Sequence, residues 1–223
     1  MPLRNLPLAN GEYYHIYNRG VALQPTYHTK RDYERFLLCF SYYRFNNLPF
    51  KLSRLLQIPK EERESIVASL EKTNDKTVEL IAFSLMPNHF HILVQQLAEG
   101  GISKFMKQIT DSYARYLNTK LDRVGPLFQG AFKAVHIEND DQLIHLSRYI
   151  HLNPLVSYIV RKEDFPEYPW SSLRNYISGH PQFVNPEIVL TNFKSPQDYL
   201  KFVMDQADYG RKLEEIKHLT LET

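Results

Sequence analysis

The chain has 223 residues, of which 43% are hydrophobic and 23% are charged, and its formal net charge is +2 at pH 7. These values describe an ordinary globular protein with one sizeable core, and so small a charge does not by itself indicate a nucleic-acid partner. The single cysteine, Cys39, excludes an internal disulfide and a cysteine-based zinc site. No apolar run reaches 18 residues, so we expect no membrane span and a cytoplasmic protein.

The first part of the chain alternates between strand and helix patterns. Glu12–Asn18 is typical of a strand that ends at Arg19-Gly20, and Arg31–Phe45 is typical of a helix with aromatic residues at helical spacing. An excursion over Leu48–Asn74 contains a second, amphipathic helix that begins after Pro59.

A hairpin is the clearest local prediction. Its strands are Val78–Met86 and His89–Gln96, and its turn is Pro87-Asn88, two residues that suit the central turn positions. With a two-residue loop, one face carries only apolar cross-strand pairs and is predicted to be core: Leu85 with Phe90, Phe83 with Ile92 and Ile81 with Val94. The other face pairs Met86 with His89 and Ser84 with His91, and there we expect a less apolar surface on which a site could open.

The second part of the chain begins with three regular elements. Ile102–Lys120 and Asp140–Leu152 are predicted helices, and Phe132–Ile137 is a predicted strand. The second of these helices is expected to stop at Asn153-Pro154, because a residue before proline is pushed out of helical geometry. The remainder is divided by prolines into short pieces, and Ser195-Pro196 begins a last helix.

Two histidines separated by one residue, His89 and His91, form the first candidate site. Residues two apart on a strand share a face, so the two imidazoles point the same way, about 6–7 Å apart along the strand. Two neutral imidazoles in this arrangement can share one divalent metal ion. A lone pair of this kind is a weak motif and is more often structural, but Phe90 between them would fix the strand's orientation in the core.

A second candidate group is a tyrosine four residues before an asparagine. Tyr149 and Asn153 share a helix face, so a phenol and an amide would project together. Without further context this is a helix terminus in which Tyr149 is a packing aromatic. Beside a metal-polarised phosphate, however, a phenol becomes a useful nucleophile, and Asn153 could offer the metal a hard oxygen ligand. Imidazoles, an amide oxygen and waters suit Mg²⁺ or Mn²⁺ better than a closed structural zinc.

Basic residues concentrate between Gly101 and Val135. That segment has a net charge of +4, against +2 for the whole chain, and aromatic residues are interleaved with its cations. Such clustering suits phosphate contacts and base stacking, although a solvated helix face has the same charge pattern. Together with two arginines outside the segment, the candidate DNA-binding residues are Arg19, Lys104, Lys107, Arg115, Tyr116, Lys120, Arg123, Lys133 and Arg148.

Seven sequence blocks follow one another over roughly residues 11 to 179: YHIYNRG (14–20), DYERFL (32–37), MPNHFH (86–91), YARYLN (113–118), GPLFQGAFK (125–133), RYIHLNP (148–154) and WSS (170–172). In this order they resemble a known family, the REP-associated branch of the single-tyrosine HUH transposases. Each block alone is a weak signal, whereas the series is highly specific.

The resemblance implies a role for each candidate residue. His89 and His91 would hold a divalent metal, Mg²⁺ or Mn²⁺, Tyr149 would be the nucleophile, and Asn153 would assist at the metal. The family cuts single-stranded DNA at the foot of hairpins, forms a 5′-phosphotyrosine and releases a 3′-hydroxyl that allows strands to be rejoined. The implied partner is therefore single-stranded or hairpin DNA. The chain would act as a monomer or homodimer that is nucleoid-associated when bound to DNA.

The implied fold is α+β, with a central antiparallel sheet and packed helices in the ferredoxin-like manner. We expect a catalytic domain over residues 11–160 with a helical insertion at about 48–74. Residues 161–223 would form an irregular or helical extension packed on that domain.

Other interpretations stay open at this point. A histidine-based nucleotide hydrolase needs a third histidine at position 93, which is Leu93 here. A domesticated hairpin-binding protein without cleavage activity would keep the same overall pattern. Tyr113 and Tyr116 are rival nucleophiles, although neither has a polar partner as clear as Asn153 four residues later, where Leu117 and Lys120 stand. His145, four residues before Tyr149, stands where we would expect an acidic side chain; it could accept a proton, bind the metal or be a bystander.

Overall fold

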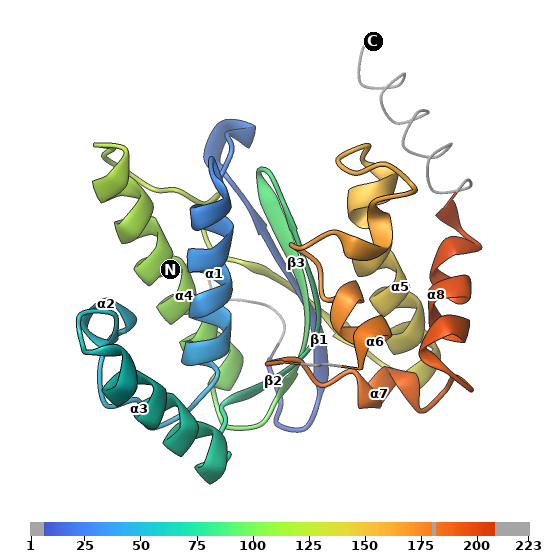
Figure 1. Cartoon of the computed structure of the whole chain (residues 1–223), viewed down its shortest axis with the longest axis horizontal. Coiled ribbons are helices and arrows are strands. Elements are labelled where there is room, and N and C mark those ends of the chain that lie inside the picture. Colours follow the sequence, from blue (N-terminus) through green and yellow to red (C-terminus); the bar gives the residue numbers. More distant parts are fainter. Residues whose placement is uncertain (1–6, 180–181, 208–223) are drawn as a thin grey trace. The chain divides into compact units, whose positions relative to one another are not determined.

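The computed structural model describes residues 7–179 and 182–207. Its elements, shown in Figure 1, begin with β1 (Tyr13–Arg19), α1 (Lys30–Tyr43), α2 (Leu52–Leu55), α3 (Lys60–Thr73), β2 (Val78–Met86) and β3 (His89–Gln96). They continue with α4 (Gly101–Lys120), β4 (Lys133–Ile137), α5 (Asp140–Val156), α6 (Leu173–Ser178), α7 (Glu187–Leu190) and α8 (Pro196–Met204). Two short 3-10 turns lie at Val21–Leu23 and Phe165–Glu167.

The four strands form one antiparallel sheet in the order β2-β3-β1-β4. Helix α1 lies in the connection from β1 to β2, and α4 in the connection from β3 to β4. Two strand–helix–strand units interleaved in this order make the ferredoxin-like arrangement. The predicted α+β fold is therefore confirmed, with α2 and α3 as the insertion between α1 and β2.

The hairpin has the predicted strand bounds and the predicted two-residue turn at Pro87-Asn88. One expectation about it is wrong, because the second face is closed as well: Ala82, Ser84, Met86 and Leu93 are all fully buried. A strand covered on both faces is built from a continuous apolar run, and that is how β2 reads in the sequence. His91 is 8% exposed, and His89 at the start of β3 is partly exposed.

Contacts along the chain divide it into two compact units. One unit takes the chain up to Glu79, together with Pro87–His89 and Val94–His136. The other takes Leu80–Met86, Phe90–Leu93 and the chain from Ile137 onward. The expected functional boundary near residue 160 is a different kind of division and stays a prediction.

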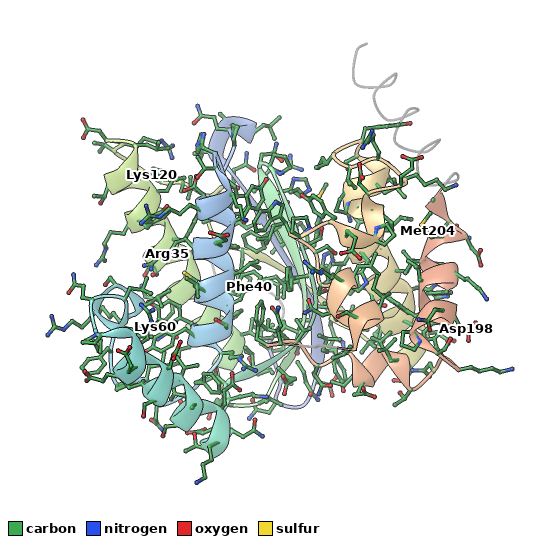
Figure 2. All side chains as sticks on the ribbon, in the orientation of Figure 1. Arg35, Phe40, Lys60, Lys120, Asp198 and Met204 are labelled. Carbon is green, nitrogen blue, oxygen red and sulfur yellow. The ribbon has the colours of Figure 1, made fainter. Side chains whose placement is uncertain are left out.

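In the first unit, α1 and α4 pack against each other through a cluster of aromatic rings. Phe36 lies 4.8 Å from Tyr113 and 4.9 Å from Phe40, measured between ring centroids, and all three are buried. Figure 2 shows Phe40 on α1, with Lys120 at the end of α4. Most of the chain's abundant aromatic residues in this unit therefore serve packing.

A buried carboxylate, Asp32, ties the start of α1 to the end of α4. It accepts hydrogen bonds from Lys120 Nζ at 2.6 Å and Tyr116 Oη at 2.9 Å, and from the backbone amides of His28 and Thr29. Burial alone would raise the pKa of Asp32, but these hydrogen bonds outweigh it and lower the pKa to about 2. Thr29 and Asp32 also form a capping box at the start of α1.

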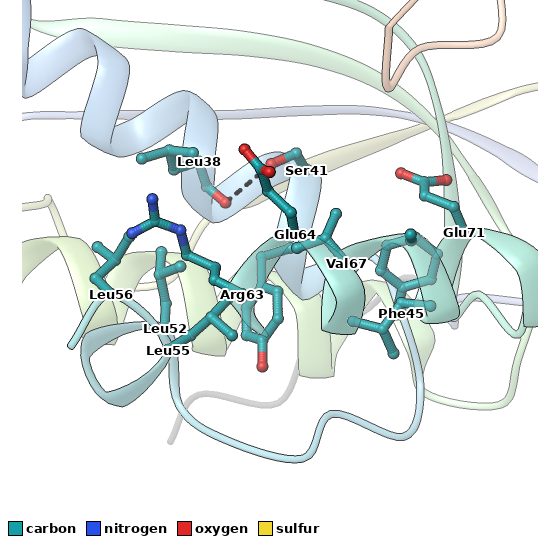
Figure 3. A pocket seen from close by; sticks show the side chains of 13 residues that line it. Leu38, Ser41, Phe45, Leu52, Leu55, Leu56, Arg63, Glu64, Val67 and Glu71 are labelled. Atoms are coloured by element: carbon teal, nitrogen blue, oxygen red, sulfur yellow. Dashed lines mark hydrogen bonds between the residues drawn. The ribbon is translucent and has the colours of Figure 1, made fainter. Parts of the chain in front are cut away.

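A cavity of about 470 Å³ that is open to solvent on one side lies between α1, α2 and α3 (Figure 3). Its lining is mostly apolar and includes Leu38, Phe45, Leu52, Leu55, Leu56, Val67, Ala68 and Leu70. The amphipathic pattern after Pro59 thus arises because α3 turns its apolar residues toward this cavity. Even so, α3 contributes no fully buried residue, and Val67 is 36% exposed.

In the second unit, α5 packs against α7 and α8, and α6 also contacts α8. A segment before α6 is hydrogen-bonded along the edge strand β2: the amide of Leu85 donates to the Trp170 carbonyl at 2.8 Å, and the amide of Ser172 donates to the Phe83 carbonyl at 3.0 Å. These bonds satisfy backbone groups that an edge strand would otherwise expose.

Helix α5 runs past the point where it was expected to stop. It continues to Val156 with Pro154 inside it, so the predicted end before Asn153-Pro154 is wrong. Proline is most harmful in a helix interior, whereas here only two helical residues follow it. The amide of Ser157 still donates to the Asn153 carbonyl at 3.0 Å, and Pro154 and Leu155 are buried. Tertiary packing therefore outweighs the local preference of the residue before proline.

Candidate active site

The two histidines of the His-x-His pair take alternate positions at the start of β3, as predicted. The turn at Pro87-Asn88 that precedes them is held by the first unit. The Pro87 carbonyl accepts a hydrogen bond from the Thr26 amide at 2.8 Å, and the Asn88 carbonyl accepts one from the Gly20 amide at 2.7 Å. The start of β3 is consequently anchored on its backbone, which limits how far the imidazoles can move.

Two hydrogen bonds of the Asn88 side chain determine which nitrogen of His89 carries its proton. Asn88 Nδ2 donates to the Leu23 carbonyl at 3.1 Å, so the other amide atom, Oδ1, faces the imidazole. His89 Nδ1 lies 2.6 Å from that oxygen, which only accepts, and Nδ1 must therefore be the protonated nitrogen. In the neutral imidazole Nε2 then carries the lone pair, and this is the form in which an imidazole ligates a metal.

His91 lies beside the predicted nucleophile. Its ring centroid is 5.6 Å from that of Tyr149, and the two rings meet edge to face at 82°. Both residues belong to the second unit. His91 is 8% exposed, whereas Tyr149 is 50% exposed, so the phenol is accessible to a large substrate while the imidazole beside it is held in the protein.

Asn153 lies one helical turn after Tyr149 and is 7% exposed. Its Nδ2 donates to the Tyr149 carbonyl at 2.9 Å, and this bond orients the amide so that Oδ1 is the atom left to accept or ligate. The predicted proximity of Tyr149 and Asn153 is present in α5.

His145 has a partner of its own, Arg148. An Nη2 proton of Arg148 is donated to His145 Nδ1 across 2.7 Å, and the guanidinium carbon lies 4.1 Å from the centre of the Phe202 ring. Arginine has no acceptor, so His145 Nδ1 must be unprotonated in this contact. Because both side chains are engaged in this way, His145 holds the guanidinium of Arg148 next to α8.

The rival tyrosines are occupied by structural hydrogen bonds. Tyr113 is fully buried, its hydroxyl donates to the Thr26 carbonyl at 2.6 Å, and burial raises its pKa far above the ordinary value. Burial and then the hydrogen bond to Asp32 raise the pKa of Tyr116. Neither phenol is as accessible as that of Tyr149, which argues against both as nucleophiles.

The predicted DNA-binding residues fall into two groups. Arg19, Arg115 and Lys133 are exposed and Arg123 partly so, and Lys107 is exposed in an ion pair with Asp111 at 2.5 Å. The others are hydrogen-bonded to other parts of the protein, although Lys104 and Lys120 are exposed as well. Lys104 donates to the Asn46 carbonyl at 3.0 Å, Tyr116 and Lys120 donate to Asp32, and Arg148 contacts His145. The first group is better placed for phosphate contacts, because the second group would have to give up these hydrogen bonds.

Two residues that matter for this geometry were missed in the sequence. Asn88 was assigned to the turn alone, and the signal for a further role was an amide directly next to a candidate ligand. His151 was passed over, and it proves to be fully buried, with hydrogen bonds to Tyr199 and Ser172. Burial lowers the pKa of His151 to about 3, so the imidazole is neutral. No local pattern marks a histidine of this kind, because its partners are distant in the chain.

The donor set is compatible with a divalent metal at β3. Within residues 7–179 and 182–207, no group of three or more His, Cys, Asp and Glu residues could hold a metal ion. Among these described residues, an ion held by His89 and His91 would therefore find further ligands in amide oxygens, with phosphate or water oxygens completing its shell. That mixture fits Mg²⁺ or Mn²⁺ and does not fit a closed zinc centre.

Within residues 7–179 and 182–207, no helix is long and apolar enough to cross a membrane.

Comparison with known proteins adds two findings. Residues 56–153, just under half of the chain, match the family described as Transposase IS200 like. The fold is similar to a solved structure of a REP-associated tyrosine transposase bound to a REP hairpin, with a TM-score of 0.55 and 15% identity. That similarity covers 87% of this chain and 96% of the other. No protein of curated function matches the sequence.

Proposed function

We infer that this chain, which matches the IS200-like transposase family over residues 56–153, cuts and rejoins single-stranded DNA at hairpins by a metal-dependent reaction through a 5′-phosphotyrosine. The observation that carries the proposal is the 5.6 Å edge-to-face contact of His91 with Tyr149. It brings a candidate metal ligand next to an exposed phenol, and the matched family segment contains both residues.

In the proposed reaction the oxygen of Tyr149 attacks the phosphorus of a DNA phosphodiester. The bond from phosphorus to tyrosine forms as the bond to the 3′-oxygen breaks. The phenol proton passes to solvent and the 3′-oxygen takes up a proton to become a free hydroxyl. Because one phosphodiester replaces another, the reverse attack by a 3′-hydroxyl restores a DNA strand without an energy source.

The metal, Mg²⁺ or Mn²⁺, would be held by His89 and His91, with Asn153 as a third ligand. When bound, such an ion neutralises phosphate charge and polarises the P–O bond. The chain's own residues prepare this arrangement. Asn88 holds the ligating tautomer of His89, and α5 presents Tyr149 beside His91. Positioning and charge neutralisation supply most of the rate in phosphoryl transfer.

The proposed substrate is a DNA hairpin with a single-stranded flank. The structurally similar transposase is bound to a REP hairpin, and the exposed cations Arg19, Lys107, Arg115 and Lys133 give this chain groups for phosphate contacts. Because His91 and Tyr149 of the same chain are adjacent, a monomer would suffice for cleavage, and we propose a monomer acting on cytoplasmic, nucleoid DNA.

The proposal is tested with a labelled single-stranded hairpin oligonucleotide and Mn²⁺ or Mg²⁺. We expect a covalent protein–DNA adduct that survives denaturation and is lost in Tyr149→Phe. Tyr158→Phe is the matched control, because Tyr158 is similarly exposed at 54% and lies just after the same helix. Binding of the hairpin without any adduct would overturn the proposal and indicate a DNA-binding protein that has lost cleavage.

A further inference from the structure

Helix α5 carries a buried polar chain on the side away from Tyr149. Ser147 and His151 are one turn apart, and Tyr149 lies midway between them in sequence, which places it about 200° around the helix from each. Ser147 and His151 are both fully buried, whereas Tyr149 is 50% exposed. The face of α5 that is opposite the phenol is thus held by polar groups inside the protein.

Five side-chain and backbone groups take part in one continuous set of hydrogen bonds. His151 Nδ1 lies 2.6 Å from the Tyr199 hydroxyl on α8, and Nε2 lies 2.7 Å from Ser172 Oγ. Ser172 Oγ accepts from the Phe83 amide of β2 at 2.8 Å. At the other end, the Tyr199 hydroxyl lies 3.0 Å from Ser147 Oγ. The chain therefore connects α5 both to the sheet and to α8 within the second unit.

Counting the available protons shows which group donates and which accepts in each of these hydrogen bonds. Ser147 donates its proton to the Ile144 carbonyl at 2.7 Å, so the Tyr199 hydroxyl donates to Ser147. Tyr199 then has no proton left for the imidazole, and His151 Nδ1 must be the donor between them. Nε2 is the acceptor for Ser172, and the single contact left unused is the longest one, 3.2 Å from Ser172 Oγ to the Phe83 carbonyl. The distances thus assign a neutral His151 with its proton on Nδ1.

We propose that His151 is a positioning residue for Tyr149, and that the chain Phe83–Ser172–His151–Tyr199–Ser147 fixes the rotation of α5 and hence the direction of the phenol. Directional bonds suit this task better than apolar packing, which tolerates rotation. Side chains extend about 5–6 Å from a helix axis, so a 10° rotation moves their ends by about 1 Å. A misplacement of about 1 Å costs about 100-fold in rate. The inference rests on the proposed role of Tyr149.

The first test distinguishes an effect of the hydrogen-bond chain from a general loss of stability. Tyr199→Phe and Ser172→Ala each remove one hydroxyl of the hydrogen-bond chain together with its two links, while Tyr176→Phe is the matched control. Tyr176 is equally buried and its ring contacts His151, but its hydroxyl donates to the Ile81 carbonyl outside the chain. In single-turnover reactions with saturating hairpin DNA and Mn²⁺, we expect adduct formation to slow by about 10- to 100-fold in the first two variants. The dissociation constant for DNA should change less than about twofold, and Tyr176→Phe should keep the wild-type rate.

Equal slowing in Tyr176→Phe, or wild-type rates in both chain variants, would overturn the positioning role. Two spectroscopic measurements need no cleavage and keep the inference separate from the proposed function. Nitrogen-15 NMR should show His151 protonated on Nδ1, and the opposite tautomer would contradict the assigned direction. Fluorine NMR of 3-fluorotyrosine placed at residue 149 should show a changed or split line in Tyr199→Phe and an unchanged line in Tyr176→Phe. If the wild type forms no adduct, the proposed function fails, and the fluorine line alone decides whether the chain orients the ring.

Discussion

The ring of His91, on β3, meets the ring of Tyr149, on α5, edge to face at a centroid distance of 5.6 Å. A contact between a buried imidazole and an exposed phenol contributes little to the stability of the fold, because a half-exposed aromatic ring removes less apolar surface from water than a core residue does. It has a clear use if the imidazole holds a metal that the phenol's target phosphate must approach. The functional account depends on this contact.

Removal of either histidine should abolish cleavage and leave most DNA binding intact. His89→Ala and His91→Ala each remove one of the two proposed imidazole ligands, whereas phosphate contacts by the exposed cations remain. Adduct formation should fall below detection, with a dissociation constant for hairpin DNA within about threefold of wild type, measured by fluorescence anisotropy. His136→Ala, on β4, is the control. Metal-dependent cleavage retained in both variants would refute the metal assignment.

Asn88 should matter for metal affinity although it need not touch the ion. It accepts a hydrogen bond from His89 Nδ1 at 2.6 Å and so holds the imidazole in its ligating form. Loss of such a supporting contact typically costs about 10- to 100-fold in metal affinity. We therefore expect Asn88→Ala to weaken Mn²⁺ binding by that amount in calorimetric titration. Asn47→Ala is the control, because Asn47 bonds to Asp75 at an exposed position. Equal affinity in Asn88→Ala and wild type would contradict this role.

Exposed cations of α4 should contribute to the salt dependence of DNA binding. Lys107→Ala or Arg115→Ala should weaken hairpin binding and reduce the slope of log affinity against log salt by about 0.7 for each lost single-strand phosphate contact. Lys60→Ala is a close match for Lys107→Ala, because Lys60 also sits in an exposed ion pair four residues from its partner, Glu64. A slope that changes as much in Lys60→Ala, or not at all in the α4 variants, would remove these residues from the footprint.

Acid should destabilise the fold through two histidines, His151, which is fully buried, and His15, which is partly buried. Burial lowers the pKa of His15 to about 4 and that of His151 to about 3, from an ordinary 6.5. Below pH 6.5 these two imidazoles are protonated in the unfolded chain but stay neutral in the folded chain. The free energy of unfolding therefore falls as pH falls. Between pH 6.5 and 5, before most carboxylates titrate, each histidine adds at most about 1.4 kcal/mol per pH unit. The free energy of unfolding, measured by urea titration at several pH values in this window, should depend less steeply on pH in His15→Gln than in the wild type. The same pH dependence in both proteins would contradict the assignment.

The parts of the fold that could be predicted are those that local chemistry decides. The hairpin has its predicted bounds because alternating strand positions and a Pro-Asn turn are properties of adjacent residues. The predicted end of α5 was wrong because the helix is extended by tertiary structure. Leu155 is buried and the Ser157 amide is hydrogen-bonded to the Asn153 carbonyl, and this packing overrides the preference of the residue before proline.

The candidate site divides in the same way. The spacing of His89 and His91, and of Tyr149 and Asn153, is visible in sequence because each pair shares one strand or one helix. Charge clustering marked the basic segment, but it could not distinguish Lys107, whose ion-pair partner Asp111 is exposed, from Lys120, whose partner Asp32 is buried. His151 could not be assigned, since its partners Ser172 and Tyr199 are brought to it only by folding.

The most direct test is to locate the covalent bond itself. The adduct formed with a short hairpin oligonucleotide and Mn²⁺ is digested with nuclease and protease, and the modified peptide is sequenced by mass spectrometry. The account predicts a nucleotide joined through its 5′-phosphate to Tyr149. A nucleotide on Tyr113, Tyr116 or any other residue, or a 3′-phosphate linkage, would contradict it.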